Sequence, residues 1–235
     1  MANAYNREDS SSHPPLLHPD YKATLERAPR EPLVCMPPTP TEATGPTDWR
    51  RIAGAAVADL TKAHAGTPIG ERIVVTGRVL DEDGRAVPGA LVEVWQANSA
   101  GRYAHPVDQH DAPLDPNFTG AGRVVTDSEG RYRFYTIEPG AYPWRNHPNA
   151  WRPKHIHFSV MGPAFATRLV TQMYFPGDPL FPFDPIFNSV TDGSARERMI
   201  CRFDMDTTRP EWALGYVWDI VLRGPATTPL DDDND

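Results

Sequence analysis

The sequence predicts an all-β protein, an antiparallel β-sandwich that carries a proline-rich N-terminal arm and long loops. From residue 70 onward, short segments rich in β-branched and aromatic residues alternate with turn signals, with little helical periodicity between them. Up to residue 46, prolines are too frequent for long helices or central strands. A chain of 235 residues is long enough for one such sandwich with extensions.

The proline-rich arm, residues 1–46, also contains many apolar side chains. They favour an arm that packs against another surface over a disordered segment, which would contain few of them. These residues are Leu16, Leu17, Tyr21, Leu25, Leu33, Val34 and Met36. Beyond the arm, the apolar spacing from Asp48 to Ala63 predicts an amphipathic helix, although Gly54 and Thr61 weaken the pattern.

The strands are predicted from period-two alternation and from their content of β-branched residues. They are expected at Arg72–Leu80, Ala90–Gln96, Gly122–Asp127, Tyr132–Ile137, His155–Val160, Leu169–Phe175 and Tyr216–Leu222. The Asp-Gly pair at 83–84 and the Ser-Glu-Gly run at 128–130 are typical of tight turns. Ser194 is the expected N-cap of a short helix that ends at Met199.

Charge and composition exclude several classes of protein. The net charge of −8 argues against a nucleic-acid-binding surface, and the acidic tail Asp231–Asp235 is expected to be a solvated end. No apolar run is long enough to span a membrane, and the N-terminus lacks the hydrophobic region of a signal peptide. With only Cys35 and Cys201 present, we expect free thiols and a cytoplasmic location.

One stretch, Pro139–Val160, carries the chemistry of this sequence. His155 and His157 lie two residues apart in a predicted strand, so they point to one face while Ile156 points into the core. Two imidazoles on one face suit a metal ion. The alternative is a pair of structural or surface histidines with ordinary hydrogen bonds.

The segment before the histidine pair favours the metal site. Four prolines stiffen it, and it carries Tyr142, Trp144 and Arg152. A rigid aromatic loop with an arginine suits a preorganised site better than a plain connection. Read structurally instead, Tyr142 would cap the core and Arg152 would form a surface ion pair.

These motifs resemble the signature of the intradiol ring-cleavage dioxygenases. The residues concerned are PGAYPWRN at Pro139–Asn146 and WRPKHIHF at Trp151–Phe158, preceded by LVEVWQAN at Leu91–Asn98, GRY at Gly101–Tyr103 and APLDPNF at Ala112–Phe118. The resemblance covers roughly Ile69 to Gly224. It is strongest to the iron-bearing β subunits of the two-subunit members of this family.

The resemblance implies a non-haem Fe(III) cofactor and a set of site residues. The iron ligands would be Tyr103, Tyr142, His155 and His157, with Tyr103 leaving the metal to act as a base and Arg152 stabilising negative charge. Trp95, Trp144, Gln172 and Ile186 match the walls of the family's pocket, and Tyr21 matches a tyrosine that reaches the substrate. Core packing explains these wall residues equally simply, and an interface contact would explain Tyr21. His105, His110 and His147 match no role.

The resemblance also implies a substrate and a partner. A proline-rich arm in place of a helical dimerisation region favours cleavage of 3,4-dihydroxybenzoate by O2 to 3-carboxy-cis,cis-muconate, in the β-ketoadipate pathway of aromatic catabolism. A homologous α subunit would contact the arm in a hetero-oligomer and help to bind the substrate carboxylate. We therefore divide the chain into a partner-contacting segment, residues 1–68, and a catalytic β-sandwich, residues 69–235.

Two other classes of function compete with this interpretation. The run GRVLDEDGRAVPGALV at Gly77–Val92 resembles transthyretin-like binding modules, but it covers two strands and leaves the tyrosines and histidines unexplained. A zinc hydrolase could use the His-x-His pair, but it would need a third nitrogen, sulfur or carboxylate ligand.

Overall fold

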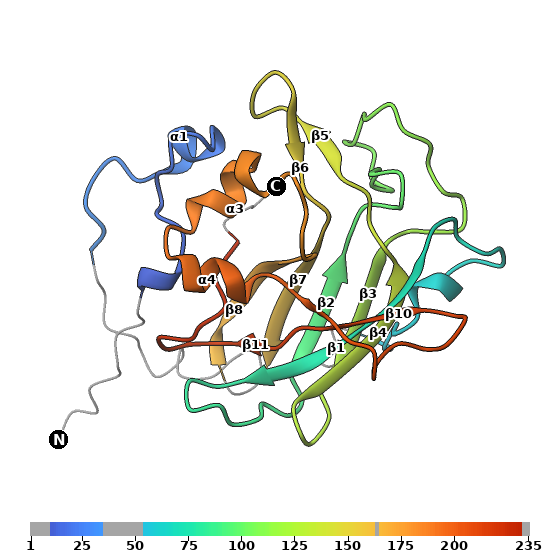
Figure 1. Cartoon of the computed structure of the whole chain (residues 1–235). Helices are drawn as coiled ribbons and strands as arrows, with labels where there is room; N and C mark the ends of the chain where they lie inside the picture. The colour runs from blue at the N-terminus through green and yellow to red at the C-terminus, as the bar shows by residue number, and fades with distance from the viewer. Residues whose placement is uncertain (1–9, 35–53, 163–164, 232–235) are drawn as a thin grey trace.

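The computed structural model describes residues 10–34, 54–162 and 165–231. It contains two β-sheets and a small separate hairpin, and its helices are all short (Figure 1). The predicted all-β sandwich is confirmed. Among the described residues, no helix is long and apolar enough to cross a membrane.

The first sheet is built around the long strand β1 (Arg72–Leu80). On one edge β1 pairs with the antiparallel strand β4 (Arg131–Ile137). On the other edge it pairs in parallel with β10 (Leu214–Val217) and, further along, with β11 (Ile220–Val221). Strand β9 (Arg202–Phe203) pairs antiparallel with the outer edge of β10. The sheet is therefore mixed rather than wholly antiparallel.

The single strand predicted at Tyr216–Leu222 is divided into β10 and β11. Between them, Trp218 turns its ring into the core and donates its backbone N–H to Thr76 O at 2.9 Å. Asp219 accepts a hydrogen bond from the backbone of Arg78 at 2.8 Å, in place of a strand carbonyl. A buried indole and a capping carboxylate thus interrupt the ladder.

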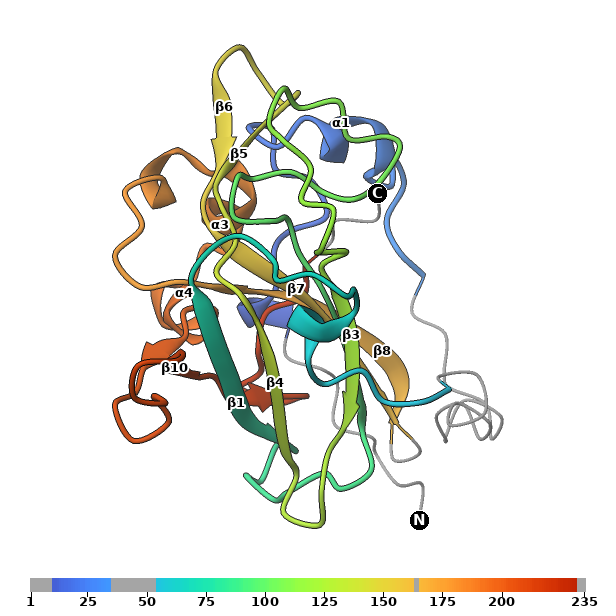
Figure 2. The ribbon, with the colours of Figure 1, turned by 90° about the vertical axis from the view of Figure 1, so that its right-hand side faces the viewer.

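The second sheet is antiparallel throughout, in the order β3, β2, β7, β8. Its strands are β2 (Leu91–Trp95), β3 (Ala121–Val125), β7 (His155–Gly162) and β8 (Phe165–Tyr174), close to the predicted ranges. In Figure 2, β1 and β4 lie in one layer, with β3 and β8 in the other. The strands predicted from residue 72 to residue 175 thus form both layers of the sandwich.

The core between the sheets is apolar and rich in aromatic rings. Phe158 on β7 is fully buried and makes edge contacts with Tyr132, Phe134 and Trp218 at centroid distances of 4.8–5.9 Å. Ile156 is also fully buried in this cluster, as its position in the strand predicts. Cys201 is a buried free thiol, and burial raises its pKa to about 12. Cys35 lies outside the described residues.

The predicted helix at Asp48–Ala63 is wrong for the part that the structure describes. Residues 54–59 form no helix, and Val57 exchanges backbone hydrogen bonds with Arg123 at 2.8 and 3.0 Å. A single 3-10 turn, η3 (Leu60–Lys62), follows, and the Asp59 side chain caps it. Pairing with the sheet therefore overrides the helical spacing. Residues 48–53 lie outside the described residues.

The remaining short helices gather on one side of the sandwich (Figure 1). They are η1 (Ser10–Ser12), α1 (Ala23–Arg27), η4 (Phe181–Phe183), α3 (Pro185–Ser189) and α4 (Gly193–Arg198). The predicted N-cap Ser194 is wrong, because Asp192 caps α4 by accepting from the backbone N–H groups of Ser194 and Ala195. Asp and Ser are about equally good N-cap residues, but the helix begins at Gly193, so Ser194 lies inside it.

The described part of the arm packs on the sandwich through one aromatic residue and through hydrogen bonds, such as those that Asn146 makes with the backbone of Asp20 and Lys22. Tyr21 is 3% exposed. The leucines and valine expected to be anchors are exposed in this chain, namely Leu16, Leu17, Leu25, Leu33 and Val34. Met36 lies outside the described residues. The prediction of a packed arm therefore holds for Tyr21, whereas its aliphatic side chains remain available to another surface.

Phe158→Ala is expected to lower the free energy of unfolding by roughly 3–5 kcal/mol, because it empties the centre of the aromatic cluster. Urea unfolding would measure this loss. Phe183→Ala, at a ring that is 69% exposed, is the control and is expected to cost less than about 1 kcal/mol. A cost below about 1 kcal/mol for Phe158→Ala as well would show that this cluster does not hold the sheets together.

Candidate metal centre

A small hairpin delivers three of the predicted site residues. Strands β5 (Tyr142–Trp144) and β6 (Ala150–Arg152) pair antiparallel, with Tyr142 opposite Arg152. The turn between them accommodates Asn149 at a φ of 62°, a conformation that asparagine tolerates. Pro153 then leads directly into β7. The hairpin therefore fixes Tyr142 and Arg152 relative to the histidine pair.

The two predicted tyrosines and two predicted histidines come together in one cluster. The Nε2 atoms of His155 and His157 are 3.2 Å apart. Tyr142 Oη lies 3.2 Å from His155 Nε2, and Tyr103 Oη lies 3.1 Å from His157 Nε2. Four candidate donor atoms from three segments of the chain, the β2–β3 connection, β5 and β7, thus come together.

His155 is held in the tautomer that a metal ion requires. Its Nδ1 lies 2.7 Å from the carbonyl oxygen of Pro153, which can only accept a hydrogen bond, so Nδ1 carries the proton. Burial, together with the charges of Arg152 and His157, holds the pKa of His155 well below its usual value. A neutral ring with its proton on Nδ1 presents a free lone pair at Nε2.

Tyr103 reaches the cluster from the long connection between β2 and β3. Its backbone N–H donates to Asp108 at 2.8 Å, which anchors the loop locally. Gly101, two residues earlier, has a φ of 76°, and a Cβ there would lie 2.1 Å from the carbonyl oxygen of Ala141. The Tyr103 loop can therefore approach the Tyr142 strand closely only because residue 101 is glycine.

The donor set fits a first-row metal ion. Adjacent ligands that each lie about 2.0–2.1 Å from a shared ion are about 3 Å apart, which matches the measured spacing. Within the described residues, no group of three His, Cys, Asp or Glu side chains is arranged to hold a metal ion. This part of the chain thus offers no third ligand of the kind that a zinc hydrolase needs, and the phenol oxygens complete the set.

Arg152 is buried, which rules out the alternative of a surface ion pair. Its side chain is 1% exposed, and its Nε lies 3.2 Å from an oxygen of the fully buried Asp184. Its Nη2 donates to Gln172 Oε1 and, at 3.0 Å, to Tyr174 Oη. Burial raises the pKa values of both Asp184 and Tyr174 from their usual ranges.

The predicted pocket residues surround the cluster to different extents. Trp95 stacks on the His157 ring at a centroid distance of 4.9 Å and an angle of 5°, so it contacts the site rather than the central core. Trp144 lies between Tyr21, at 5.6 Å, and the guanidinium of Arg152, at 5.5 Å. Gln172 is fully buried and accepts a hydrogen bond from Arg152, so it holds that side chain in place.

Two hollows lie near the cluster. A narrow crevice between the arm and the helices includes Tyr21, Ile186 and Asp231 in its lining. A wider hollow of about 440 Å³ lies between the arm and the end of the β5–β6 hairpin, and its lining includes Lys22 and His147. None of the four candidate donors lines either hollow.

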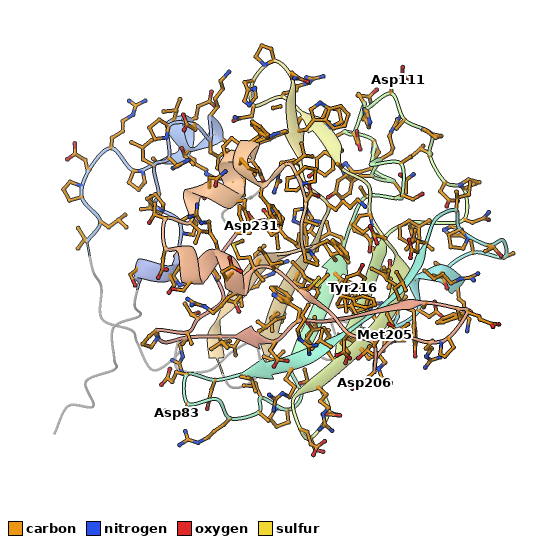
Figure 3. All side chains as sticks on the ribbon, viewed as in Figure 1. Asp83, Asp111, Met205, Asp206, Tyr216 and Asp231 are labelled. Carbon is orange, nitrogen blue, oxygen red and sulfur yellow. The ribbon has the colours of Figure 1, made fainter. Side chains whose placement is uncertain are left out.

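The prediction that Asp231–Asp235 is a solvated end is wrong at Asp231. Its side chain is fully buried, and Figure 3 labels it in the interior, above strand β8. It accepts a hydrogen bond from Gln172 Nε2 and has an oxygen 3.6 Å from His157 Nδ1. Burial alone would raise the pKa of this carboxyl, but its interactions with His157 and Arg152 lower it. Residues 232–235 lie outside the described residues.

Sequence reasoning missed three residues of the buried network: Tyr174, Asp184 and Asp231. Tyr174 could have been found, because it lies two residues from Gln172 and therefore on the same face of β8. Asp184 precedes Pro185, a pattern typical of a helix start, which explains its capping role but not its contact with Arg152. Nothing in an acidic tail distinguishes Asp231 from its neighbours.

The other loop histidines lie apart from the four donors. His105 and His147 are exposed and interact with their own loops, at Val107 N and Pro148 O. His110 contacts the Trp151 ring at 6.2 Å. The structure therefore gives none of them a position among the candidate ligands.

Comparison with known proteins identifies the family of this chain. The family model described as "Dioxygenase" matches residues 44–224, and the chain belongs to the intradiol ring-cleavage dioxygenase family. A second model, described as "Protocatechuate 3,4-dioxygenase beta subunit N terminal", matches residues 5–39. The chain is 59% identical over 225 residues to the protocatechuate 3,4-dioxygenase beta chain of Burkholderia cepacia, covering 95% of each chain.

More distant relatives share the main domain. The alpha chain of the Burkholderia cepacia protocatechuate 3,4-dioxygenase is 30% identical, over 69% of this chain and 78% of that one. Hydroxyquinol 1,2-dioxygenase of a Rhizobium species is 33% identical, over 70% of this chain and 59% of that one. The crystal structure of catechol 1,2-dioxygenase from Pseudomonas arvilla C-1 matches with a TM-score of 0.53 at 26% identity, covering 73% of this chain and 59% of that one.

Gly101→Ala is expected to separate the Tyr103 loop from the Tyr142 strand and to reduce the amount of metal that copurifies with the protein by at least about tenfold. The matched control is Gly177→Ala, because Gly177 has a similar φ of 75° but open space around it. Both variants introduce the same backbone strain, but only Gly101→Ala introduces a clash with Ala141 O. Metal analysis of the two variants would therefore separate the effect of the clash from the effect of the strain. Equal metal content in the two variants would contradict the close-approach argument.

Proposed function

We propose that this protein is the iron-bearing β subunit of a protocatechuate 3,4-dioxygenase. The reaction cleaves 3,4-dihydroxybenzoate between its two hydroxyl-bearing carbons and adds both atoms of O2, giving 3-carboxy-cis,cis-muconate. The observation that carries this proposal is the convergence of two phenol oxygens and two imidazole nitrogens at spacings of 3.1–3.2 Å. The 59% identity to a protocatechuate 3,4-dioxygenase beta chain supports the choice of substrate.

The proposed cofactor is a non-haem Fe(III) ion. Tyr103 and Tyr142 would bind it through Oη, and His155 and His157 through Nε2. Two phenolates are hard anionic donors, and such donors favour the ferric over the ferrous state. The bound ion would supply Lewis acidity, which draws electron density from a bound catecholate and activates its ring toward O2.

Tyr103 is the proposed acceptor of a substrate proton. It lies in the long connection between β2 and β3, whereas Tyr142 lies on a paired strand that resists movement. Tyr103 can therefore swing away from the cluster while the other three donors stay fixed. Its phenolate oxygen then takes a proton from a catechol hydroxyl as that hydroxyl approaches the site.

Arg152 is the proposed stabiliser of negative charge on the reacting substrate. A buried guanidinium in water-poor surroundings acts more strongly than an exposed one. Asp184, Gln172 and Tyr174 hold it in one orientation, so little reorganisation is needed as charge develops. Trp144, which lies against the guanidinium of Arg152, and Tyr21, whose ring contacts Trp144, are proposed to line the substrate pocket.

A homologous α subunit is the proposed partner. The aliphatic side chains of the arm are exposed in this chain and can be covered by another subunit, and the same arm contributes Tyr21 to the crevice. The similarity of this chain to both an alpha and a beta chain of one relative supports an assembly of two homologous subunits. We propose that the partner closes the substrate pocket and supplies a contact for the substrate carboxylate.

The purified protein is expected to show a visible phenolate-to-Fe(III) absorption band that shifts when 3,4-dihydroxybenzoate is added without O2. Tyr142→Phe removes one phenolate, so most of the band and of the bound iron should be lost. Tyr135→Phe, outside the cluster on β4, is the control and should retain both. A wild-type protein that is colourless and free of iron even after reconstitution would refute the proposal.

The role of Arg152 is tested by removing its charge without leaving an unpaired charge behind. The double variant Arg152→Gln/Asp184→Asn is expected to retain iron and its visible band but to lose about 100-fold or more in kcat. Arg78→Gln/Asp219→Asn removes an exposed ion pair and should leave kcat unchanged. Oxygen uptake measures kcat, and near-normal turnover by the first variant would exclude Arg152 as the stabilising charge.

A further inference from the structure

His157 carries a buried nitrogen that the candidate ligand set does not use. Its Nε2 faces the other donors, whereas its Nδ1 is buried with no partner at hydrogen-bonding distance among the described residues. When Nε2 binds a metal ion, Nδ1 must carry the proton of the neutral ring. A buried N–H of this kind needs an acceptor, because leaving it unsatisfied costs free energy.

The group that faces this nitrogen is the carboxylate of Asp231. Its Oδ2 lies 3.6 Å from His157 Nδ1, slightly beyond hydrogen-bonding distance, and its side chain is fully buried. Histidine ligands commonly donate their second ring N–H to a carboxylate or a carbonyl, which fixes the ring and makes it a better donor. His155 already does so with Pro153 O.

The C-terminal segment is tied down so that Asp231 stays beneath His157. The backbone N–H of Asp231 donates to Val170 O on β8 at 2.7 Å, and that of Leu230 donates to His13 Nδ1 in the arm at 3.1 Å. Gln172 donates its side-chain N–H to the carboxylate from the neighbouring position on β8. Three hydrogen bonds with two segments, β8 and the arm, therefore hold this end of the chain and its acidic side chain in place.

We propose that Asp231 is a positioning residue of the metal site, which accepts a hydrogen bond from His157 Nδ1 when Nε2 binds the metal. The inference rests on the proposed iron site. Trp95 stacks on one face of the His157 ring and restrains its tilt, while the carboxylate fixes its rotation and increases the electron density at Nε2. The two histidine ligands then differ, because His155 is supported by a neutral carbonyl and His157 by an anion.

The same carboxylate connects the metal ligand to the arginine network. Gln172 donates through Nε2 to Asp231 and accepts through Oε1 from Arg152, so its amide joins the two charged groups. The positive charge of Arg152 thus has one carboxylate in direct contact, Asp184, and a second one across the amide of Gln172. These contacts give the buried Asp231 carboxylate a hydrogen-bond donor and a nearby cation, which lessens the cost of burying it.

The test compares Asp231→Asn with the wild-type protein in their iron-loaded forms. Asparagine keeps the shape and an acceptor oxygen but removes the charge. A strong chelator is expected to remove iron about 10–100-fold faster from Asp231→Asn, and the visible band should change in energy. Asp206→Asn, the same change at an exposed carboxylate, is the control and should behave as wild type. Asp231→Glu, which keeps the charge, should release iron more slowly than Asp231→Asn.

The outcomes separate this inference from the proposed function. A wild-type protein without iron would refute the iron site itself. Iron in all proteins, with the same release rate and band in wild type and Asp231→Asn, would refute the positioning role. Faster release accompanied by a lower unfolding temperature but an unchanged band would also refute it, because Asp231 would then only hold the C-terminal segment in place.

Discussion

The two-residue periodicity of strand β7 is the constraint on which this molecule depends. Ile156 and Phe158 point into the apolar core, while His155 and His157 point to the opposite face. Because both faces are buried, a shift of one residue would put imidazoles into the core and a phenyl ring into the site. The pairing of His157 with Trp95 on β2 and Gln172 on β8 makes this register specific. Stability and chemistry are therefore set by the same hydrogen-bond ladder.

A second feature is the way in which buried charge is balanced around the site. Arg152 and Asp184 would each be costly to bury alone, and they are tolerated because they contact each other and polar side chains on β8. The result is a rigid cation close to a cluster of donor atoms that would be anionic in the phenolate form. Electrostatic preorganisation of this kind needs a well-packed second layer, which the β8 side chains and α3 supply.

Most of the fold and of the donor cluster could be predicted from the sequence, because both follow local patterns. Period-two alternation located the strands, and the same alternation brought His155 and His157 to one face. The predictions that were wrong concern features that depend on contacts between segments far apart in the sequence. The extended pairing of Val57 overrode a helical pattern, and the parallel pairing of β10 and β11 with β1 has no local signal. Asp231 belongs to an ordinary acidic tail in the sequence, and only its contacts with Val170 and Gln172 in the fold distinguish it from its neighbours.

The parallel pairing of β1 with β10 has a consequence for biosynthesis. Strand β1 lies early in the chain and β10 near its end, so the first sheet remains open along one edge until most of the chain has left the ribosome. Contacts between segments so far apart in sequence form slowly, because the loop between them must close first. The segment that carries Asp231 follows β10, so the support beneath His157 forms only after β10 has been synthesised. The candidate donors are thus complete in sequence before the carboxylate that faces one of them is made.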